Sequence, residues 1–379
     1  MKTMSSIHRL RVFPLLAAAL LFPGSVSATE ANLRYAEGFR VESMGNATLV
    51  TVTPEWRRGS ATFRYLLVPR GESPPPDAPP AQVVPVPVRR VVVLSTTYLA
   101  YMDAAGLVDR IVALSDFRHV NTPSVRRMID DGALREVGNF SKLRVERVME
   151  LAPDLILTPA SGAGFDIHPK LIEAGLPTAL VVDHLEADPL ARCEWIKFLA
   201  LFFGAGERAA ELFREIEGRY LALAEKGRAA EDRPTVLINT PFQGQWWAPR
   251  GQSYVARLIR DAGGDYLWAD TQGVGSEPMD IETVYDRALT ADVWINTGLW
   301  TSLEDALSAD PRFAEIRPLK TGRVFNNNKR LNPWGGNDYW ESGVLRPDVI
   351  LADLIKIFQP ALAPDHELFY YRRLEGATP

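Results

Sequence analysis

A long helical pattern near the middle of the chain separates two segments in which strand and helix patterns alternate. The pattern begins at Pro189, breaks at Gly204-Ala-Gly206 and continues to about Ala230. In its second part, apolar residues recur at spacings of three and four, as in an amphipathic helix. About 24 residues would span roughly 36 Å, which is long for a surface helix of one domain. We therefore expect residues 206–231 to form a spine helix between two lobes.

On both sides of this spine, short apolar runs alternate with helical segments. Val91-Val-Val-Leu before the spine and Thr235-Val-Leu-Ile after it are continuous apolar runs, typical of strands buried on both faces. Alternation of strands and helices favours a mostly parallel sheet. The predicted fold class is α/β, with an N-terminal lobe at residues 89–205 and a C-terminal lobe at residues 232–360.

A short motif occurs once in each half of the chain. Val145-Glu146-Arg-Val148 precedes Pro153-Asp154-Leu-Ile-Leu, and Ile281-Glu282-Thr-Val284 precedes Ala291-Asp292-Val-Trp-Ile. Each copy is a helix with an early glutamate, followed by a strand that aspartate introduces. The repeat predicts two similar lobes. Because open α/β sheets bind ligands at the carboxyl ends of their strands, two such lobes facing each other would make a cleft.

The two ends of the chain have patterns of their own. Residues 1–28 combine a basic start, an apolar run too short to span a bilayer and a Val-Ser-Ala ending, which predicts a signal peptide cleaved after Ala28. Residues 29–71 alternate as β-strands do and predict a small β appendage that packs on the first lobe and extends its sheet. The proline-rich stretch 72–88 is expected to be an extended linker. Residues 361–379 are expected to form a C-terminal tail.

Composition narrows the class of protein. The net charge of −5 argues against a nucleic-acid partner, and no second apolar stretch approaches 18 residues, so the mature chain is expected to be soluble. The single cysteine, Cys193, excludes an intrachain disulfide and lies far from the cleavage site, where a lipoprotein would need a cysteine. We expect a monomeric, periplasmic protein that is not lipid-anchored.

Several stretches of the chain resemble a known family. The resemblance covers about residues 88–360 and implies two Rossmann-like lobes joined by a single rigid helix, with little closure on binding. The similar stretches, in order, are Arg90-Val-Val-Val-Leu-Ser-Thr-Thr, Gly106-Leu-Val-Asp-Arg-Ile-Val-Ala-Leu-Ser-Asp, Val137-Gly138 and Leu151-Ala-Pro-Asp-Leu-Ile-Leu. These stretches resemble the periplasmic binding proteins of iron-siderophore, haem and vitamin B12 ABC importers.

The resemblance implies a function in import. The protein would bind a metal chelate, first a ferric siderophore and next cobalamin or haem, and deliver it to an ABC permease and ATPase complex in the inner membrane. In this family a glutamate on each lobe docks on arginines of the membrane subunits, and Glu146 and Glu282 match these positions. Both are also first-turn glutamates, which stabilise a helix dipole, so a purely structural role stays open.

Loops that follow the strands supply the candidate ligand contacts. Aromatic side chains offer broad apolar faces to a bulky chelate, and Arg118 could pair with its acidic groups. His119 could coordinate a metal, although a lone histidine is more often a polar contact. For any single tryptophan, core packing is the alternative. The candidate ligand-binding residues are Phe117, Arg118, His119, Asn139 and Phe140 on the first lobe, and Trp246, Trp247, Ser276, Trp334, Asn337, Tyr339 and Trp340 on the second.

Three other functions compete with chelate import. Catalysis is not expected, because the chain has no Gly-x-Ser-x-Gly elbow, Walker loop or His-Glu-x-x-His motif, and Cys193 lies in an apparent helix. No resident cofactor or zinc site is predicted, because the histidines are scattered. A receptor for a free metal ion would need several histidine and carboxylate ligands in its cleft. A periplasmic ligand sensor would use the same fold as a transport receptor.

Overall fold

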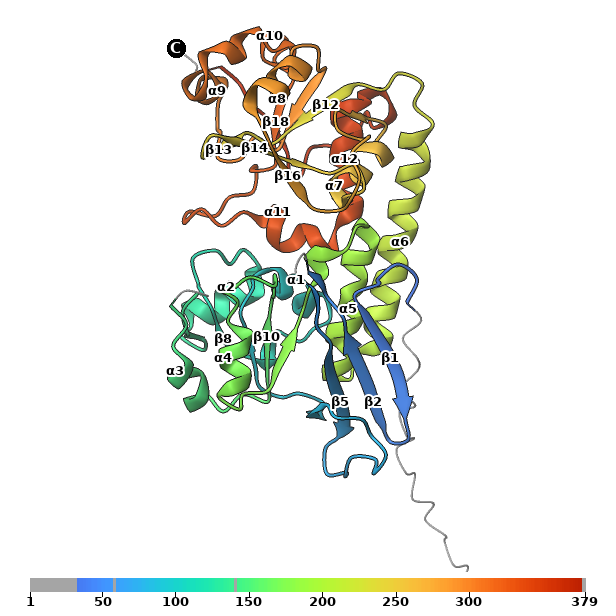
Figure 1. Cartoon of the computed structure of the whole chain (residues 1–379), viewed down its shortest axis with the longest axis vertical. Helices are drawn as coiled ribbons and strands as arrows, with labels where there is room; N and C mark the ends of the chain where they lie inside the picture. The colour runs from blue at the N-terminus through green and yellow to red at the C-terminus, as the bar shows by residue number, and fades with distance from the viewer. Residues whose placement is uncertain (1–32, 57–58, 140–141, 377–379) are drawn as a thin grey trace, which may run out of the picture.

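Two α/β lobes stack along the long axis of the molecule, with a pair of long helices beside them (Figure 1). The computed structural model describes residues 33–56, 59–139 and 142–376 of the chain. The predicted signal peptide and Phe140 lie outside these residues. Within them, no helix has the length and apolar character needed to cross a membrane. The predicted fold class, α/β with two lobes, is confirmed.

The first lobe is built on a parallel sheet. Its three central strands are almost entirely buried and mostly apolar, which is typical of a sheet covered on both faces. In spatial order the strands are β11 (Thr178–Leu180), β10 (Leu155–Thr158), β7 (Val91–Val93), β8 (Ile111–Leu114) and β9 (Arg135–Glu136). The helices are α1 (Thr97–Ala104), η1 (Val108–Arg110), α2 (Pro123–Asp130), α3 (Val145–Glu150), α4 (His168–Glu173) and η2 (Asp183–Leu185).

The second lobe has a similar sheet with one antiparallel edge strand. Its order is β15 (Asp265–Tyr266), β12 (Thr235–Ile238), β17 (Val293–Ile295), β18 (Val324–Asn326) and antiparallel β19 (Arg372–Arg373). A small antiparallel sheet joins β13 (Pro241–Phe242), β14 (Gln245–Pro249) and β16 (Ser276–Met279). The helices are α7 (Tyr254–Asp261), α8 (Ile281–Ala288), α9 (Leu303–Ala309), η3 (Pro311–Glu315), α10 (Arg317–Thr321), α11 (Asp338–Glu341), η4 (Ser342–Leu345), α12 (Pro347–Phe358) and η5 (Pro360–Leu362).

The two lobes repeat one topology, as the short sequence motif predicts. The order β8-β7-β10-β11 in the first lobe corresponds to β15-β12-β17-β18 in the second. In the first lobe the chain runs from β7 to its neighbour β8 and later crosses to β10 on the other side of β7. In the second lobe it runs from β12 to its neighbour β15 and later crosses to β17 on the other side of β12. The crossing creates a topological switch point between β7 and β10, and another between β12 and β17. Open α/β sheets bind their ligands at such points.

The aspartate of the motif has the same role in both lobes. Asp154 accepts the N–H groups of Arg89 and Arg90, just before β7, and Asp292 accepts the N–H of Thr235, the first residue of β12. Burial raises the pKa of both carboxyl groups, but these hydrogen bonds and nearby arginines outweigh it and hold each pKa below its ordinary value. Asp154 therefore joins the start of β10 to the start of β7, and Asp292 joins the start of β17 to the start of β12.

Two long helices connect the cores of the lobes. Helix α5 (Pro189–Phe203) begins with the side chain of Asp188 accepting the N–H of Leu190 at 2.7 Å and ends at Gly204 in the left-handed conformation. Helix α6 (Gly206–Arg228) follows at once. Phe213 on α6 packs in the first core and Tyr220, two turns later, in the second. The expected spine helix is therefore present and contributes to both lobes.

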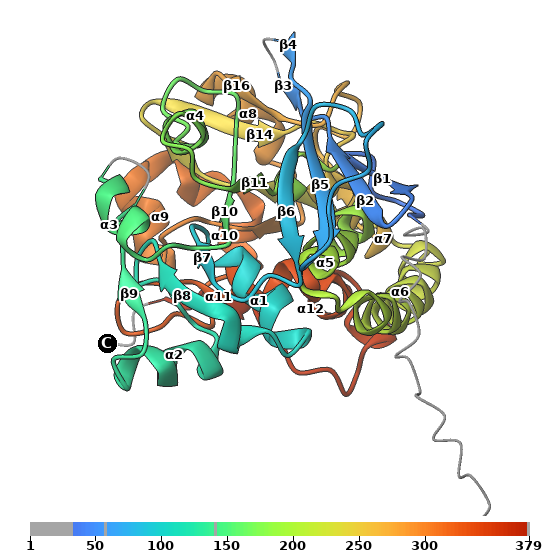
Figure 2. The same cartoon turned by 90° about the horizontal axis from the view of Figure 1, so that it is seen from below.

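The N-terminal strands form a sheet of their own, which lies beside α5 (Figure 2). Its order is β1 (Phe39–Met44), β2 (Ala47–Val52), β5 (Phe63–Pro69) and β6 (Gln82–Val86), with β6 parallel to β5 and the other pairs antiparallel. Strands β3 (Glu55–Trp56) and β4 (Gly59–Ser60) pair separately. The sheet shares the core of the first lobe, which confirms that the appendage packs there.

Two expectations for this region are wrong. The sheet does not extend that of the first lobe, because it packs on α5 through its face: the Phe39 ring lies 4.8 Å from that of Trp195 and 5.3 Å from that of Phe198. Residues 72–88 are not a free linker, because they contain β6 and because the turn around Ala78 packs on the outer face of the sheet.

The segment 361–379 is not a tail over its described part, which ends at residue 376. Asp353 on α12 is fully buried and accepts the backbone N–H groups of Phe369, Tyr370 and Tyr371. Strand β19 follows and pairs with β18, and both tyrosines lie in the core of the second lobe. The second lobe therefore includes this segment.

Candidate functional site

The carboxyl ends of the two sheets face each other at the boundary between the lobes. Thr97, at the start of α1 after β7, donates its hydroxyl to the carbonyl of Trp340 at 3.1 Å. Glu341 ends α11, which lies between the lobes, just above α1 in Figure 1. Its carboxylate accepts the N–H groups of Asn121 and Thr122, which follow β8, at 2.7 and 2.6 Å. Because open α/β sheets bind ligands at the carboxyl ends of their strands, the candidate site is expected at this boundary.

Replacing Glu341 by alanine is expected to lower the free energy of unfolding by about 3 kcal/mol, because a buried and a partly buried N–H group of the other lobe lose their acceptor. Burial raises the pKa of this carboxyl group, and the hydrogen bonds from Thr122 and Asn121 oppose that rise. Glu341→Gln keeps an acceptor oxygen and should lose less. Urea unfolding followed by circular dichroism measures both, with the exposed Glu150→Ala as control. An unchanged value for Glu341→Ala would show that this contact does not hold the lobes together.

The asparagine-rich segment before α11 also bridges the lobes. The Asn332 amide donates to the carbonyls of Arg118 and Val120 at 2.8 and 3.1 Å. Gly336 lies against the first lobe so closely that a Cβ there would come within 2.6 Å of the His119 carbonyl oxygen. Asn337, a predicted ligand contact, accepts the N–H at position 339 and so caps α11. This segment therefore closes one side of the boundary.

Arg118 and His119 lie at this boundary and are exposed. The Arg118 guanidinium binds the Asp116 carboxylate through Nη2 at 2.6 Å and through Nε at 3.2 Å. The hydrogen bond from Arg118 holds the pKa of Asp116 below its ordinary value. His119 Nδ1 lies 3.8 Å from the same carboxylate. The cationic loop that the sequence predicts is thus neutralised by its own aspartate.

The remaining first-lobe candidates lie beside this loop. Phe117 is half-buried against the core of the first lobe, and its N–H donates to Glu136. Asn139 is exposed and follows β9, at the edge of the sheet. The structure therefore brings Phe117, Arg118 and His119 to the boundary as one group, while Asn139 lies one strand further out.

The prediction that Trp246 contacts the ligand is wrong. The stretch that contains it is not a loop but the β13–β14 hairpin, in which neighbouring side chains point to opposite faces. Trp246 is 1% exposed, stacks on Trp294 and donates its indole N–H to the Ile238 carbonyl at 2.9 Å. Trp247, on the other face, is exposed. Ser276 is half-buried at the start of β16, which pairs with β14.

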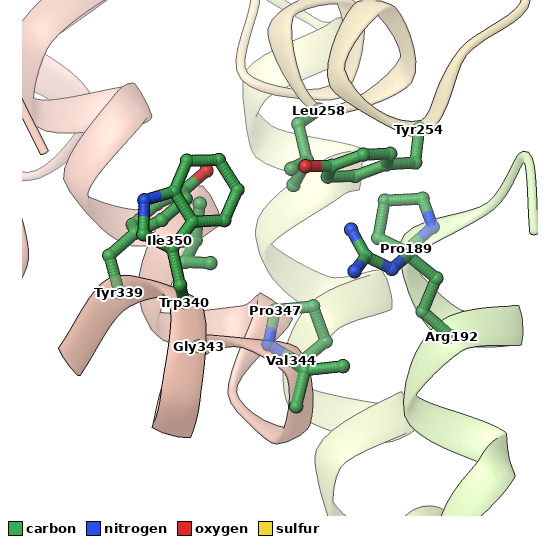
Figure 3. A pocket seen from close by; sticks show the side chains of 10 residues that line it. All are labelled: Pro189, Arg192, Tyr254, Leu258, Tyr339, Trp340, Gly343, Val344, Pro347 and Ile350. Atoms are coloured by element: carbon green, nitrogen blue, oxygen red, sulfur yellow. The ribbon is translucent and has the colours of Figure 1, made fainter. Parts of the chain in front are cut away.

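A small cavity lies where α5, α7, α11, η4 and α12 meet (Figure 3). Its volume is about 30 Å³, which holds one or two water molecules. The buried Tyr339 and the exposed Trp340 line one side, and Arg192 and Tyr254 the other. A chelate is larger than this cavity. The cavity alone therefore cannot be the site of such a ligand.

Arg192 and Tyr254 were not identified from the sequence. The guanidinium carbon of Arg192 lies 4.1 Å from the centre of the Tyr254 ring, and its Nη2 lies 3.7 Å from a carboxylate oxygen of Asp183. Burial raises the pKa of Asp183 to about 6, although Arg192 opposes the rise. The sequence feature that could have identified Arg192 as a candidate is its position, as a charged residue near the start of the otherwise apolar helix α5.

Several exposed apolar side chains lie on loops and on the hairpin that follow the strands of the two lobes. Trp334 lies under the Arg126 guanidinium, 4.4 Å from its carbon, so this tryptophan partly bridges the lobes. The exposed apolar residues that follow strands are Phe165 in the first lobe and Phe242, Trp247, Leu299, Leu331, Trp334 and Trp340 in the second lobe. In the described part of the chain, no group of three or more histidine, cysteine, aspartate or glutamate side chains is arranged to hold a metal ion.

Comparison with known proteins places the chain in a family. Residues 91–331, more than half of the chain, match the family model described as periplasmic binding protein. The chain belongs to this family. Its members are substrate-binding proteins of ABC importers, as the resemblance in the sequence implies.

Relatives and solved structures agree with this assignment. An uncharacterised lipoprotein of Methanocaldococcus jannaschii is 29% identical over 289 residues, covering 74% of this chain and 67% of the relative. A vitamin B12-binding protein of Vibrio parahaemolyticus is 24% identical over 238 residues, covering 59% and 78%. A periplasmic haem-binding protein of Pseudomonas aeruginosa superposes with a TM-score of 0.57 at 18% identity. The superposition covers 77% of the present chain and 100% of the haem-binding protein. At such identity the structural match shows the shared fold.

Proposed function

We propose that this protein is a periplasmic receptor that binds a metal chelate between its lobes and delivers it to an ABC permease and ATPase. The observation that carries the proposal is the set of exposed apolar side chains on segments that leave the carboxyl ends of both sheets. Ligand sites are mostly apolar with a few placed polar groups, and they occur at strand ends of this kind. Family membership supports the role in import.

The charges at the boundary favour a chelate of low net charge. Arg118 is paired with Asp116, and Arg192 lies beside Asp183. Arg330 is paired with Asp338 at 2.6 Å. Because each of these arginines has a carboxylate beside it, the local net charge is close to zero, and a polyanionic ferric siderophore would gain little attraction there. A neutral chelate with broad apolar faces, such as a corrinoid, suits the boundary better.

Tryptophan fluorescence of the mature protein tests this function. Trp334 and Trp340 are exposed beside the first lobe, and Trp247 is exposed on the hairpin after β12, so a chelate with a chromophore should quench their emission. We expect saturable quenching at micromolar or lower concentration by cyanocobalamin, and weaker or no quenching by ferric enterobactin. Hemin and free Fe³⁺, Zn²⁺ and Mn²⁺ complete the panel, and N-acetyltryptophanamide corrects for absorption by the ligand. A response to a bare ion alone would favour a metal-ion receptor, and no response at all would favour a sensor of another ligand.

Glu146 and Glu282 are proposed to dock on the permease. Both are exposed in the first turn of their helices, α3 and α8, and these helices precede equivalent third strands, β10 and β17. Glu282 forms an exposed ion pair with Arg312 at 2.8 Å. Such surface pairs contribute about 0–1 kcal/mol, so a stronger basic partner could replace Arg312.

The protein is further proposed to be exported and not lipid-anchored. The sequence after the apolar run reads Val26-Ser-Ala-Thr29, without the cysteine that lipid attachment requires. The relative from Methanocaldococcus jannaschii is named a lipoprotein, so the two chains would differ in this respect. Osmotic-shock release of the full-length protein into the soluble periplasmic fraction is the expected result. Retention in the membrane fraction would contradict it.

A further inference from the structure

One segment of the second lobe contacts the first lobe in two different ways. It comprises residues 331–341, between β18 and α12, and includes α11, which lies between the lobes (Figure 1). Its last residue is firmly anchored, because the fully buried carboxylate of Glu341 accepts the N–H groups of Asn121 and Thr122. Residues 331–337, here called the tip, are held only at an exposed surface.

The tip is a self-contained loop. Leu331 pairs with Asn337 across its base. The side-chain oxygen of Asn332 accepts the N–H groups of Trp334 and Gly336 at 2.9 and 2.8 Å. Over the described residues, every hydrogen bond of the tip lies within it or joins it to α11 or to the first lobe. The tip can therefore move as one body without disrupting the core of the second lobe.

Arg330 and Asp338 flank the tip and fix its two ends. The N–H of Asp338 donates to the carbonyl of Arg330 at 3.0 Å, and their side chains form an ion pair at 2.6 Å. The guanidinium carbon of Arg330 also lies 4.3 Å from the centre of the Phe369 ring, in the second lobe. Because these contacts hold both ends together and to their own lobe, they provide a pivot for the tip.

Few and weak contacts hold the tip against the first lobe. The Asn332 amide donates to the carbonyls of Arg118 and Val120. Trp334 lies under the Arg126 guanidinium but is still 54% exposed. A neutral hydrogen bond changes an equilibrium by roughly two- to tenfold, and an exposed cation–π contact by roughly two- to fivefold. A set of contacts this small leaves a minor population with the tip off the first lobe.

The fit of the tip depends on Gly336. A Cβ at this position would lie 2.6 Å from the His119 carbonyl oxygen and 2.7 Å from the His119 Cα. Because these are backbone atoms of the first lobe, a side chain at position 336 would push the tip away. In the observed position the tip covers the backbone of residues 118–120, which follow β8 at the boundary.

We infer that the tip is a gate, which pivots about Arg330 and Asp338, moves off residues 118–120 and opens the boundary while the two lobes keep their positions. Helices α5 and α6 each contribute side chains to both cores, which favours motion of the tip over motion of the lobes. The cavity at the closed boundary measures about 30 Å³, so a chelate needs such an opening. The role in admitting a ligand rests on the proposed function, whereas the motion does not.

Distances between nitroxide labels on the ligand-free mature protein test the motion. Cys193 is fully buried, so labels attach to introduced cysteines. The pair Glu150→Cys, Pro333→Cys measures from the first lobe to the tip. The pair Glu150→Cys, Asp286→Cys measures from the first lobe to the second. All three positions are exposed, and double electron–electron resonance gives both distance distributions.

Two substitutions should shift the tip toward its open position. Asn332→Asp keeps the oxygen that accepts within the tip, but it replaces the amide donor by an oxygen that faces two carbonyls of the first lobe. Gly336→Ala places a methyl group against His119. In each variant the longer component of the tip distance should grow about tenfold, and the distance between the lobes should stay unchanged. Asn337→Asp is the control for charge, because it retains the oxygen that caps α11, and both distances should match the wild type.

The outcomes separate the gate from the proposed function. A tip distance that neither variant changes overturns the inference, and so does a longer distance between the lobes in the same variants. For whichever of cyanocobalamin and hemin the wild type binds, stopped-flow fluorescence should show association faster by the factor by which the open population grows. An unchanged association rate with a changed tip distance overturns the role as a gate. If the wild type binds no chelate, the proposed function fails, and the distances alone decide whether the tip moves.

Discussion

A mature chain that lacks residues 29–86 is expected not to fold. The deletion removes the whole N-terminal sheet, whose inner face covers the aromatic side of α5. Trp195, Phe198 and Phe202 would all become exposed, and they are among the largest fully buried side chains of the protein. Burial of one large aromatic side chain is worth about 3–5 kcal/mol in substitution experiments, and whole domains are stable by only about 5–15 kcal/mol.

The deletion also removes backbone N–H groups that bind the carboxylate of Glu194. Glu194 on α5 is fully buried and accepts the N–H groups of Arg34, Tyr35 and Ala36, at 2.8–3.1 Å. Among the described residues beyond position 86, Lys197, at 2.6 Å, would remain as its partner. The truncated chain would lose these hydrogen bonds, which contribute about 1.5–3 kcal/mol each when the acceptor is charged.

A point substitution tests the same contact more gently. Phe39→Ala should lower the free energy of unfolding by about 4 kcal/mol, because the ring packs between Trp195 and Phe198. Val83→Ala, at an exposed position of β6, is the control and should change it by less than about 0.5 kcal/mol. Urea unfolding and near-ultraviolet circular dichroism measure both variants and the truncated chain. A truncated chain with a cooperative transition and native aromatic signals would show that the sheet is dispensable.

Strands and helices of the lobes could be predicted because their signals are local. Runs such as Val91–Val93 are buried on both faces, and Asp188, with Pro189 and Gly204, marks the ends of α5 by its own chemistry. The placement of the N-terminal sheet and of residues 361–376 could not be predicted in this way. It depends on contacts between residues far apart in the chain, such as those of Asp353 with Tyr370.

The candidate site was predictable as a region and less so by residue. The rule that ligands bind at the carboxyl ends of strands brings Arg118, His119 and Trp340 to the boundary, where the structure has them. It does not tell which side of a hairpin Trp246 faces, because that depends on strand pairing. The pairing of Arg118 with a carboxylate could have been predicted from the sequence, because Asp116 lies only two residues earlier.

Charge reversal at both docking glutamates is expected to abolish uptake without changing ligand affinity. In the double variant Glu146→Lys, Glu282→Lys, the two lysines would meet the arginines that the family resemblance places on the membrane subunits, and like charges would repel. Uptake of the ligand by cells that carry the cognate permease and ATPase is the measurement, with affinity of the purified protein measured by calorimetry. The matched control is Glu150→Lys, Asp286→Lys, which reverses two exposed carboxylates on the same helices, α3 and α8.

The alternative role of these glutamates gives a different result. If they only stabilise the dipoles of α3 and α8, each substitution should lower the free energy of unfolding by about 0.3–1 kcal/mol, and uptake should remain. If they belong to the ligand site, affinity should fall together with uptake. Only loss of uptake with wild-type affinity, confined to positions 146 and 282, supports docking. Wild-type uptake should also weaken as ionic strength rises, because salt screens the attraction between exposed charges over about 8–10 Å.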